Sequence, residues 1–184
     1  MPKATFKAVR GPLSREAIIR SGIDCPEIYG DPGILLPRYF NPDIKKSKKY
    51  GVIPHHTEYN MVSSYFKGNS NIVVINLETL DVEKTTIEIL ACEATISSSL
   101  HGLIISHAYG IPSTWVEFSK NLYGDGVKFQ DYLESVGIKN YKPELIKHTI
   151  STETIEMLLN KEDLLPDIKL INNIQNKLLE VFPV

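Results

Sequence analysis

Residues 96–107 read Ile-Ser-Ser-Ser-Leu-His-Gly-Leu-Ile-Ile-Ser-His, and two periodicities meet within this stretch. The segment 94–97 predicts a buried strand, and the apolar residues over 100–109 recur at the three- and four-residue steps of a helix. A strand that passes directly into a helix is the building unit of parallel sheets. The stretch therefore predicts an α/β fold.

The same junction is a candidate anion site. Free backbone N–H groups and the positive end of the helix dipole meet there, and the hydroxyls of Ser97, Ser98 and Ser99 are available to the same anion. His101 adds a side chain whose unperturbed pKa suits proton transfer near neutrality, and a catalytic and a structural role are both open for it. His107 shares the helix face of the apolar stripe, which favours a core or subunit-contact histidine.

Strand-like and helix-like segments alternate through the first two thirds of the chain. Expected strands cover residues 4–9, 50–54, 72–76, 94–97 and 113–116, and expected helices cover 14–21, 58–67, 82–92 and 100–109. This alternation predicts parallel βαβ units, and the continuous apolar runs at 51–53 and 72–75 are typical of strands covered on both faces. The predicted fold is a doubly wound parallel sheet.

Helical patterns dominate from residue 121 onward, with expected helices at 129–136, 152–160 and 166–181. The last of these carries one apolar stripe, formed by Leu170, Ile171, Ile174, Leu178 and Phe182. We therefore expect residues 1–120 to form a single α/β lobe and residues 121–184 to form a helical extension packed on the same lobe.

Composition excludes several classes of protein. The formal net charge of −2 over 184 residues gives no indication of electrostatic binding to nucleic acid. Cys25 and Cys92 are far apart in the sequence, which is typical of structural thiols in a reducing compartment. No acidic or histidine cluster has metal-ligand spacing, so we expect no metal. No apolar run approaches the ~20 residues that span a bilayer. We expect a cytoplasmic protein, with peripheral association at the inner membrane face left open.

Polar segments follow the expected strands, at 10–14, 55–58, 76–78 and 97–101. In open parallel sheets, ligands bind outside the carboxyl ends of the strands. Arg10 would present a guanidinium fork to a phosphate or carboxylate there, and a surface arginine is the alternative. Of the adjacent His55 and His56, one would reach the pocket and the other would pack. Lys128 would reach a phosphate or cap a helix.

The chain resembles the polysaccharide pyruvyl transferase family, in its exopolysaccharide ketal-pyruvate transferase branch. The similar pieces lie at residues 9–14, 30–33, 51–55, 99–104 with 108–112, and 128–137. The most specific of them is the Leu-His-Gly segment that begins at Leu100. Many family members carry arginine directly before this segment, where the chain has Ser99.

The resemblance implies transfer of the enolpyruvyl unit of phosphoenolpyruvate onto two hydroxyls of a surface polysaccharide or exopolysaccharide, which forms a pyruvate ketal. It implies that His101 transfers the proton and that Arg10 holds the donor's phosphate or carboxylate. Donor and acceptor are then the partners, and no cofactor is implied. Substrate-binding residues under this reading are Ser97, Ser98, Ser99, Gly102, His55 and Lys128.

The resemblance also implies a two-lobed architecture like that of GT-B glycosyltransferases, with the active site between two lobes. The chain matches the second, Rossmann-like lobe, so we expect a donor-binding lobe that an N-terminal lobe or a second copy completes. Closure of two lobes excludes water and completes such a site, so activity of this lobe alone and activity only with a second lobe are alternatives. A nucleotide-sugar glycosyltransferase lobe would have the same architecture, and a non-catalytic remnant that binds a partner protein is a third hypothesis.

Overall fold

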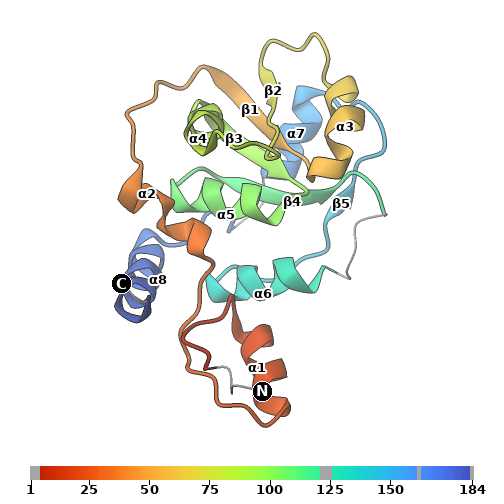
Figure 1. The fold of residues 1–184 in the computed structure, drawn as a ribbon. Helices are drawn as coiled ribbons and strands as arrows, with labels where there is room; N and C mark the ends of the chain where they lie inside the picture. Colours follow the sequence, from red (N-terminus) through yellow and green to blue (C-terminus); the bar gives the residue numbers. More distant parts are fainter. Residues whose placement is uncertain (1–4, 121–125, 161–162, 183–184) are drawn as a thin grey trace.

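A parallel sheet forms the centre of the computed structural model, which describes residues 5–120, 126–160 and 163–182 (Figure 1). Its strands are β1 (Lys48–Ile53), β2 (Ile72–Val74), β3 (Cys92–Ser97), β4 (Ser113–Glu117) and β5 (Glu144–Leu145), in the spatial order β2-β1-β3-β4-β5. All four strand pairings are parallel. The predicted doubly wound α/β fold is confirmed. The order changes direction between β1 and β3, which is where open sheets of this kind bind ligands.

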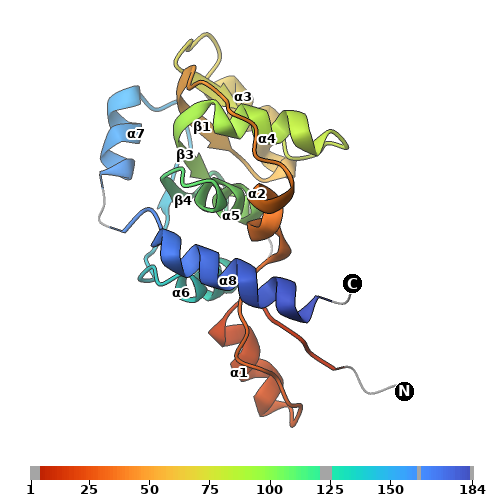
Figure 2. The ribbon, with the colours of Figure 1, turned by 90° about the vertical axis from the view of Figure 1, so that its left-hand side faces the viewer.

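Helices cover both faces of the sheet (Figure 2). On one face lie α4 (Val82–Leu90) and α5 (Leu100–Ala108), and on the other lie α3 (Tyr59–Tyr65) and α7 (Thr152–Leu159). Beside α5 pack α6 (Val127–Ser135) and α8 (Ile168–Val181), and α1 (Pro12–Arg20) extends outward from α6. Short elements complete the description: the 3-10 helices η1 (Pro32–Leu35) and η2 (His56–Glu58), and α2 (Leu36–Tyr39).

Alternation along β1 divides the core into two layers. Tyr50 and Val52 pack with α3 and α7, whereas Ile53 packs with Ile89 of α4. Successive strand residues point to opposite faces, and helices on both faces bury them, which explains the continuous apolar run in this strand.

The strand expected at residues 4–9 is wrong. From Thr5 onward this segment makes only an isolated bridge between Val9 and Tyr29. Val9 N–H donates to the Ile28 carbonyl and Gly30 N–H donates to the Val9 carbonyl, both at 3.0 Å. The apolar pattern was that of a strand, but its partner is the loop before η1 and not the sheet.

The expected helical extension also contributes a strand. β5 pairs with β4, and α6 and α8 share a core with α5 in which Trp115 of β4 stacks on Phe129 at a centroid distance of 4.5 Å. Residues beyond 120 therefore continue the sheet as well as covering it. With two residues, β5 is too short for its periodicity to be read from the sequence.

Candidate active site

A pocket of about 590 Å³ opens at the carboxyl ends of β1, β2 and β3. Five of the predicted site residues line it: Arg10, His55, Ser99, His101 and Lys128. They come from four separate segments of the chain, so the fold brings them together. Further lining comes from the loop after β2 and the start of α4, where Leu77, Glu78 and Val82 line the pocket.

The start of α5 places His101 at this pocket. Ser99 is the extended N-cap residue of α5, and no side chain caps the helix there. The first N–H groups of a helix lack intrahelical partners, and they carry the positive end of its dipole. Ser99 and His101 line the pocket beside these groups, and the His101 side chain is 66% exposed.

Gly102 brings α5 close to the sheet. A Cβ atom at this position would lie 2.5 Å from Ser97 Oγ and 2.6 Å from Ile53 Cγ2. Only a residue without a side chain lets the first turn of the helix approach β1 and β3 this closely. The structure thus accounts for Gly102 by packing, and the predicted contact with substrate stays a prediction.

The three serines before His101 lie in different surroundings. Ser97 is fully buried, and its hydroxyl lies within hydrogen-bond distance of the carbonyl oxygens of Ile53 and Ser99, at 2.9 and 2.7 Å. Ser98 is also fully buried and donates to Glu58 at 2.6 Å. Of the three, only Ser99 lines the pocket. The hydroxyls of Ser97 and Ser98 hold the turn together and are not directed at a ligand in the pocket.

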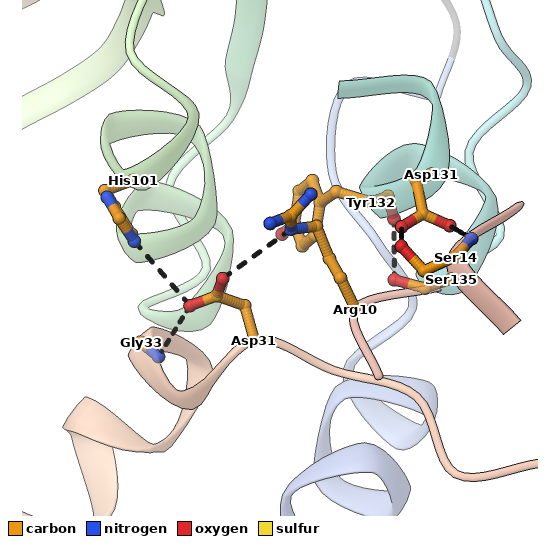
Figure 3. A network of polar contacts seen from close by, with 8 residues as sticks. All are labelled: Arg10, Ser14, Asp31, Gly33, His101, Asp131, Tyr132 and Ser135. Carbon is orange, nitrogen blue, oxygen red and sulfur yellow. Dashed lines mark hydrogen bonds and ion pairs between the residues drawn. The ribbon is translucent and has the colours of Figure 1, made fainter. Parts of the chain in front are cut away.

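Asp31 lies between the two predicted catalytic residues (Figure 3). Its Oδ2 is 3.8 Å from Arg10 Nε and its Oδ1 is 3.9 Å from His101 Nε2. Both separations exceed a hydrogen bond, so the two donors keep their capacity for a ligand. The Arg10 Nε atom is buried and has no hydrogen-bond partner among the described residues. A buried N–H group without a partner indicates a missing acceptor.

Sequence reasoning missed Asp31. The segment 30–33 was noted only as a piece similar to the family, yet Asp31 is the N-cap of η1 and accepts a hydrogen bond from Gly33 N–H at 3.0 Å. An aspartate directly before Pro32 and Gly33 is a typical helix-start signal, and it could have indicated a fixed carboxylate. Its closeness to Arg10 depends on the bridge between Val9 and Tyr29, which no local pattern predicts.

Arg10 reaches the pocket through tertiary contacts of α1. Gly11 is the N-cap of α1 and has no side chain, and Asp131 of α6 accepts hydrogen bonds from Ser14 N–H and Ser14 Oγ in its place (Figure 3). A Cβ atom at Gly11 would lie 2.0 Å from the Asp131 carbonyl oxygen. Arg10 was expected to follow a strand of the sheet, and this expectation is wrong. Its position is set by α6 and by the loop before η1.

Both histidines after β1 line the pocket. The expectation that one of them packs elsewhere is wrong, because β1 ends at Ile53 and strand alternation no longer applies. The two rings lie against each other at a centroid distance of 4.2 Å. Burial, followed by His56 and Lys128, lowers the pKa of His55.

His107 is the core histidine that its helical phase predicts. It is 1% exposed, and its ring contacts the Tyr132 hydroxyl at 3.0 Å and the Ser113 carbonyl at 3.3 Å. Burial lowers the pKa of His107 to about 4. The two histidines of α5 are thus separated, His101 toward the pocket and His107 into the core.

Other features bear on the class of site. Within residues 5–120, 126–160 and 163–182, no group of three or more histidine, cysteine or acidic side chains could hold a metal ion. Cys25 and Cys92 are buried free thiols, as predicted, and burial raises the pKa of Cys92 to about 12. None of the helices in the described part of the chain could cross a membrane.

Comparison with known proteins identifies the family. The sequence profile of polysaccharide pyruvyl transferases matches residues 1–119, and the similar piece at 128–137 lies beyond that match. An uncharacterized protein of Acanthamoeba polyphaga mimivirus is 37% identical over 134 residues, which cover 66% of this chain and 46% of that protein. The chain thus spans about half the length of this curated relative. No solved structure matches the chain with significance. With well over half of its residues matched by the profile, the chain belongs to the polysaccharide pyruvyl transferase family.

Proposed function

We propose that the pocket binds phosphoenolpyruvate and that His101 starts the transfer of its pyruvyl unit to hydroxyls of a surface polysaccharide or exopolysaccharide. The observation that carries the proposal is the buried Nε of Arg10, which has no hydrogen-bond partner within the described part of the chain and lies in the same pocket as His101 and the N-terminus of α5. An anion with several acceptor oxygens could accept hydrogen bonds from Arg10 Nε, from His101 and from the first N–H groups of α5.

The charges of the pocket suit this donor. Arg10 and Lys128 both line the pocket. Their positive charges replace that of the arginine which many family members carry at the position of Ser99. Phosphate and carboxylate groups accept charge-assisted hydrogen bonds from guanidinium groups. Asp31 limits the net positive charge and acts as a counter-ion to Arg10 and to a protonated His101.

His101 would donate its proton to the methylene carbon of the donor. The two electrons of the C2–C3 double bond form the new C–H bond, and C2 becomes electrophilic. A saccharide hydroxyl then attacks C2, and the C2–O bond to phosphate breaks. Arg10 and the N-terminus of α5 hold the departing phosphate. A second hydroxyl closes the ketal. Phosphoenolpyruvate is a metabolite of the cytoplasm, so the proposal assigns the reaction to that compartment.

Calorimetric titration of phosphoenolpyruvate tests donor binding. Replacing Arg10 with Gln is expected to weaken binding about 10- to 100-fold, as loss of charged hydrogen bonds does. The matched control is Arg20→Gln, which removes an exposed arginine that pairs with Glu16, and it should bind as wild type does. His101→Gln should bind the donor and release no phosphate when an oligosaccharide is added.

Two results would contradict the proposal. One is a wild-type protein that neither binds phosphoenolpyruvate nor releases phosphate with a saccharide acceptor. The other is thermal stabilisation by a nucleoside diphosphate and none by phosphoenolpyruvate, which would favour the nucleotide-sugar glycosyltransferase lobe instead.

A further inference from the structure

We infer that His55 takes the proton from the saccharide hydroxyl that attacks the donor, and that the buried carboxylate of Glu58 positions it for this task. The inference rests on the proposed pyruvyl transfer and deepens it. Transfer requires a proton donor for the methylene carbon and a proton acceptor for the hydroxyl. His101 supplies the proton for the methylene carbon, and the acceptor for the hydroxyl proton is a different group.

Glu58 ties together the ends of three neighbouring strands. It is 4% exposed, and its carboxylate accepts hydrogen bonds from Ser98 Oγ after β3 and Ser119 Oγ after β4, each at 2.6 Å. The Ser98 hydroxyl in turn accepts a hydrogen bond from His55 N–H, after β1, at 3.0 Å. β1, β3 and β4 are adjacent in the sheet. Glu58 thus fixes the backbone of His55 from inside the protein.

The ring of His55 is also held. Its Nδ1 lies 2.8 Å from Thr57 Oγ1, and its face lies against His56. We assign the tautomer in which Nδ1–H donates to the Thr57 hydroxyl, so that Nε2 carries the lone pair. His55 and His101 line the same pocket. A ring fixed at one nitrogen and unprotonated at the other is suited to accept a proton.

The two pocket histidines have opposite electrostatic surroundings. His101 lies beside the Asp31 carboxylate. His55 is partly buried and faces His56 and Lys128, all of which lower its pKa, and Glu58 alone acts in the opposite direction. At neutral pH the ring of His55 is therefore uncharged. Titratable groups with opposed surroundings are typical of an acid and base pair.

The proton balance closes with both histidines. His101 gives a proton to C3 of the donor. His55 Nε2 takes the proton of the first hydroxyl as its oxygen bonds to C2, and it passes this proton to the departing phosphate. The proton of the second hydroxyl then restores His101. No further reactant is needed.

His55→Gln is the first test. It should bind phosphoenolpyruvate within about twofold of wild type and lower the rate of phosphate release with acceptor about 100-fold or more, the size of general base catalysis. The acidic limb of its kcat profile should disappear. His148→Gln, at an exposed position outside the pocket, is the control and should match wild type in all three measurements.

The second test follows the His55 ring by NMR in the full chain. In wild type we expect an uncharged ring at pH 7 with its proton on Nδ1, and in Glu58→Gln we expect the pKa of His55 to fall further and kcat to fall with an unchanged KM for the donor. Donor binding by wild type with normal transfer by His55→Gln would overturn the inference alone, as would a charged His55 ring at pH 7. A wild-type protein that does not bind the donor overturns the proposed function with it.

Discussion

Acidification should destabilise the protein through His107. Its neutral ring is satisfied inside the core: Nε2–H donates to the Ser113 carbonyl, and Nδ1 accepts from the Tyr132 hydroxyl. Protonation would add a buried charge and remove the acceptor of the Tyr132 hydroxyl. Burial therefore lowers the pKa of His107 to about 4 in the folded chain, compared with about 6.5 in the unfolded chain.

The sign and the size follow from proton linkage. Between about pH 6.5 and pH 4 the unfolded chain binds a proton at His107 that the folded chain does not, so the free energy of unfolding falls as the pH falls. The full difference corresponds to about 3 kcal/mol, of which about 2 kcal/mol is lost by pH 5. Above about pH 6.5 this contribution is complete and does not change further.

Urea denaturation at pH 7.5 and pH 5 measures the effect. His107→Gln is expected to be less stable than wild type at pH 7.5, and to lose about 2 kcal/mol less than wild type between the two pH values. His55 titrates in both proteins and cancels in this difference. The control is His148→Gln, at an exposed position. Its free energy of unfolding should fall between pH 7.5 and pH 5 by as much as that of wild type. Equal losses in wild type and His107→Gln would refute the reasoning, as would an NMR titration in which the His107 ring becomes charged near pH 6.5.

Three further substitutions test how the pocket is built. Gly102→Ala should destabilise the fold by about 1–3 kcal/mol in urea denaturation, because its Cβ would overlap Ser97 and Ile53; a stabilised variant would mean that helix propensity outweighs packing here. Asp131→Ala should cost about 2 kcal/mol by leaving Ser14 N–H without its acceptor, and hydrogen exchange should locate the loss in α1, whereas unchanged protection of α1 would contradict this. Asp31→Asn should bind phosphoenolpyruvate about tenfold more tightly in calorimetry, since a nearby negative charge is removed, and should release phosphate more slowly; weaker binding would show that Asp31 helps to hold the donor.

Local periodicity predicted most of the longer strands and helices correctly. The strands at β1 and β3 and the helices α4, α5 and α8 lie within a few residues of their expected positions, and helical phase separated His101 from His107. The same reasoning failed at residues 4–9, where strand-like alternation pairs with a loop. It also missed β5, whose two residues carry no periodic signal.

The candidate site was predictable in its residue types but not in its contacts. His101, Arg10, His55, Ser99 and Lys128 were all expected and all line one pocket. Asp31 and Glu58 were not expected, because each acts through partners that lie far away in the sequence. Ser97 and Ser98 show the converse: both were expected to bind substrate, but their hydroxyls are hydrogen-bonded to Ile53 of β1 and to Glu58 of η2.

The sequence by itself determined the parallel α/β sheet and the position of His101 at the start of a buried helix, because both depend on the order of apolar and polar residues over short stretches. The tertiary structure alone decided the pairing of Asp31 with Arg10 and His101, the burial of Glu58 between three strand ends, and the approach of Lys128 to the same pocket. These placements depend on contacts between distant segments, such as Val9 with Tyr29 and Ser14 with Asp131. Local propensity carries no information about such contacts, because they form only when the whole chain is packed.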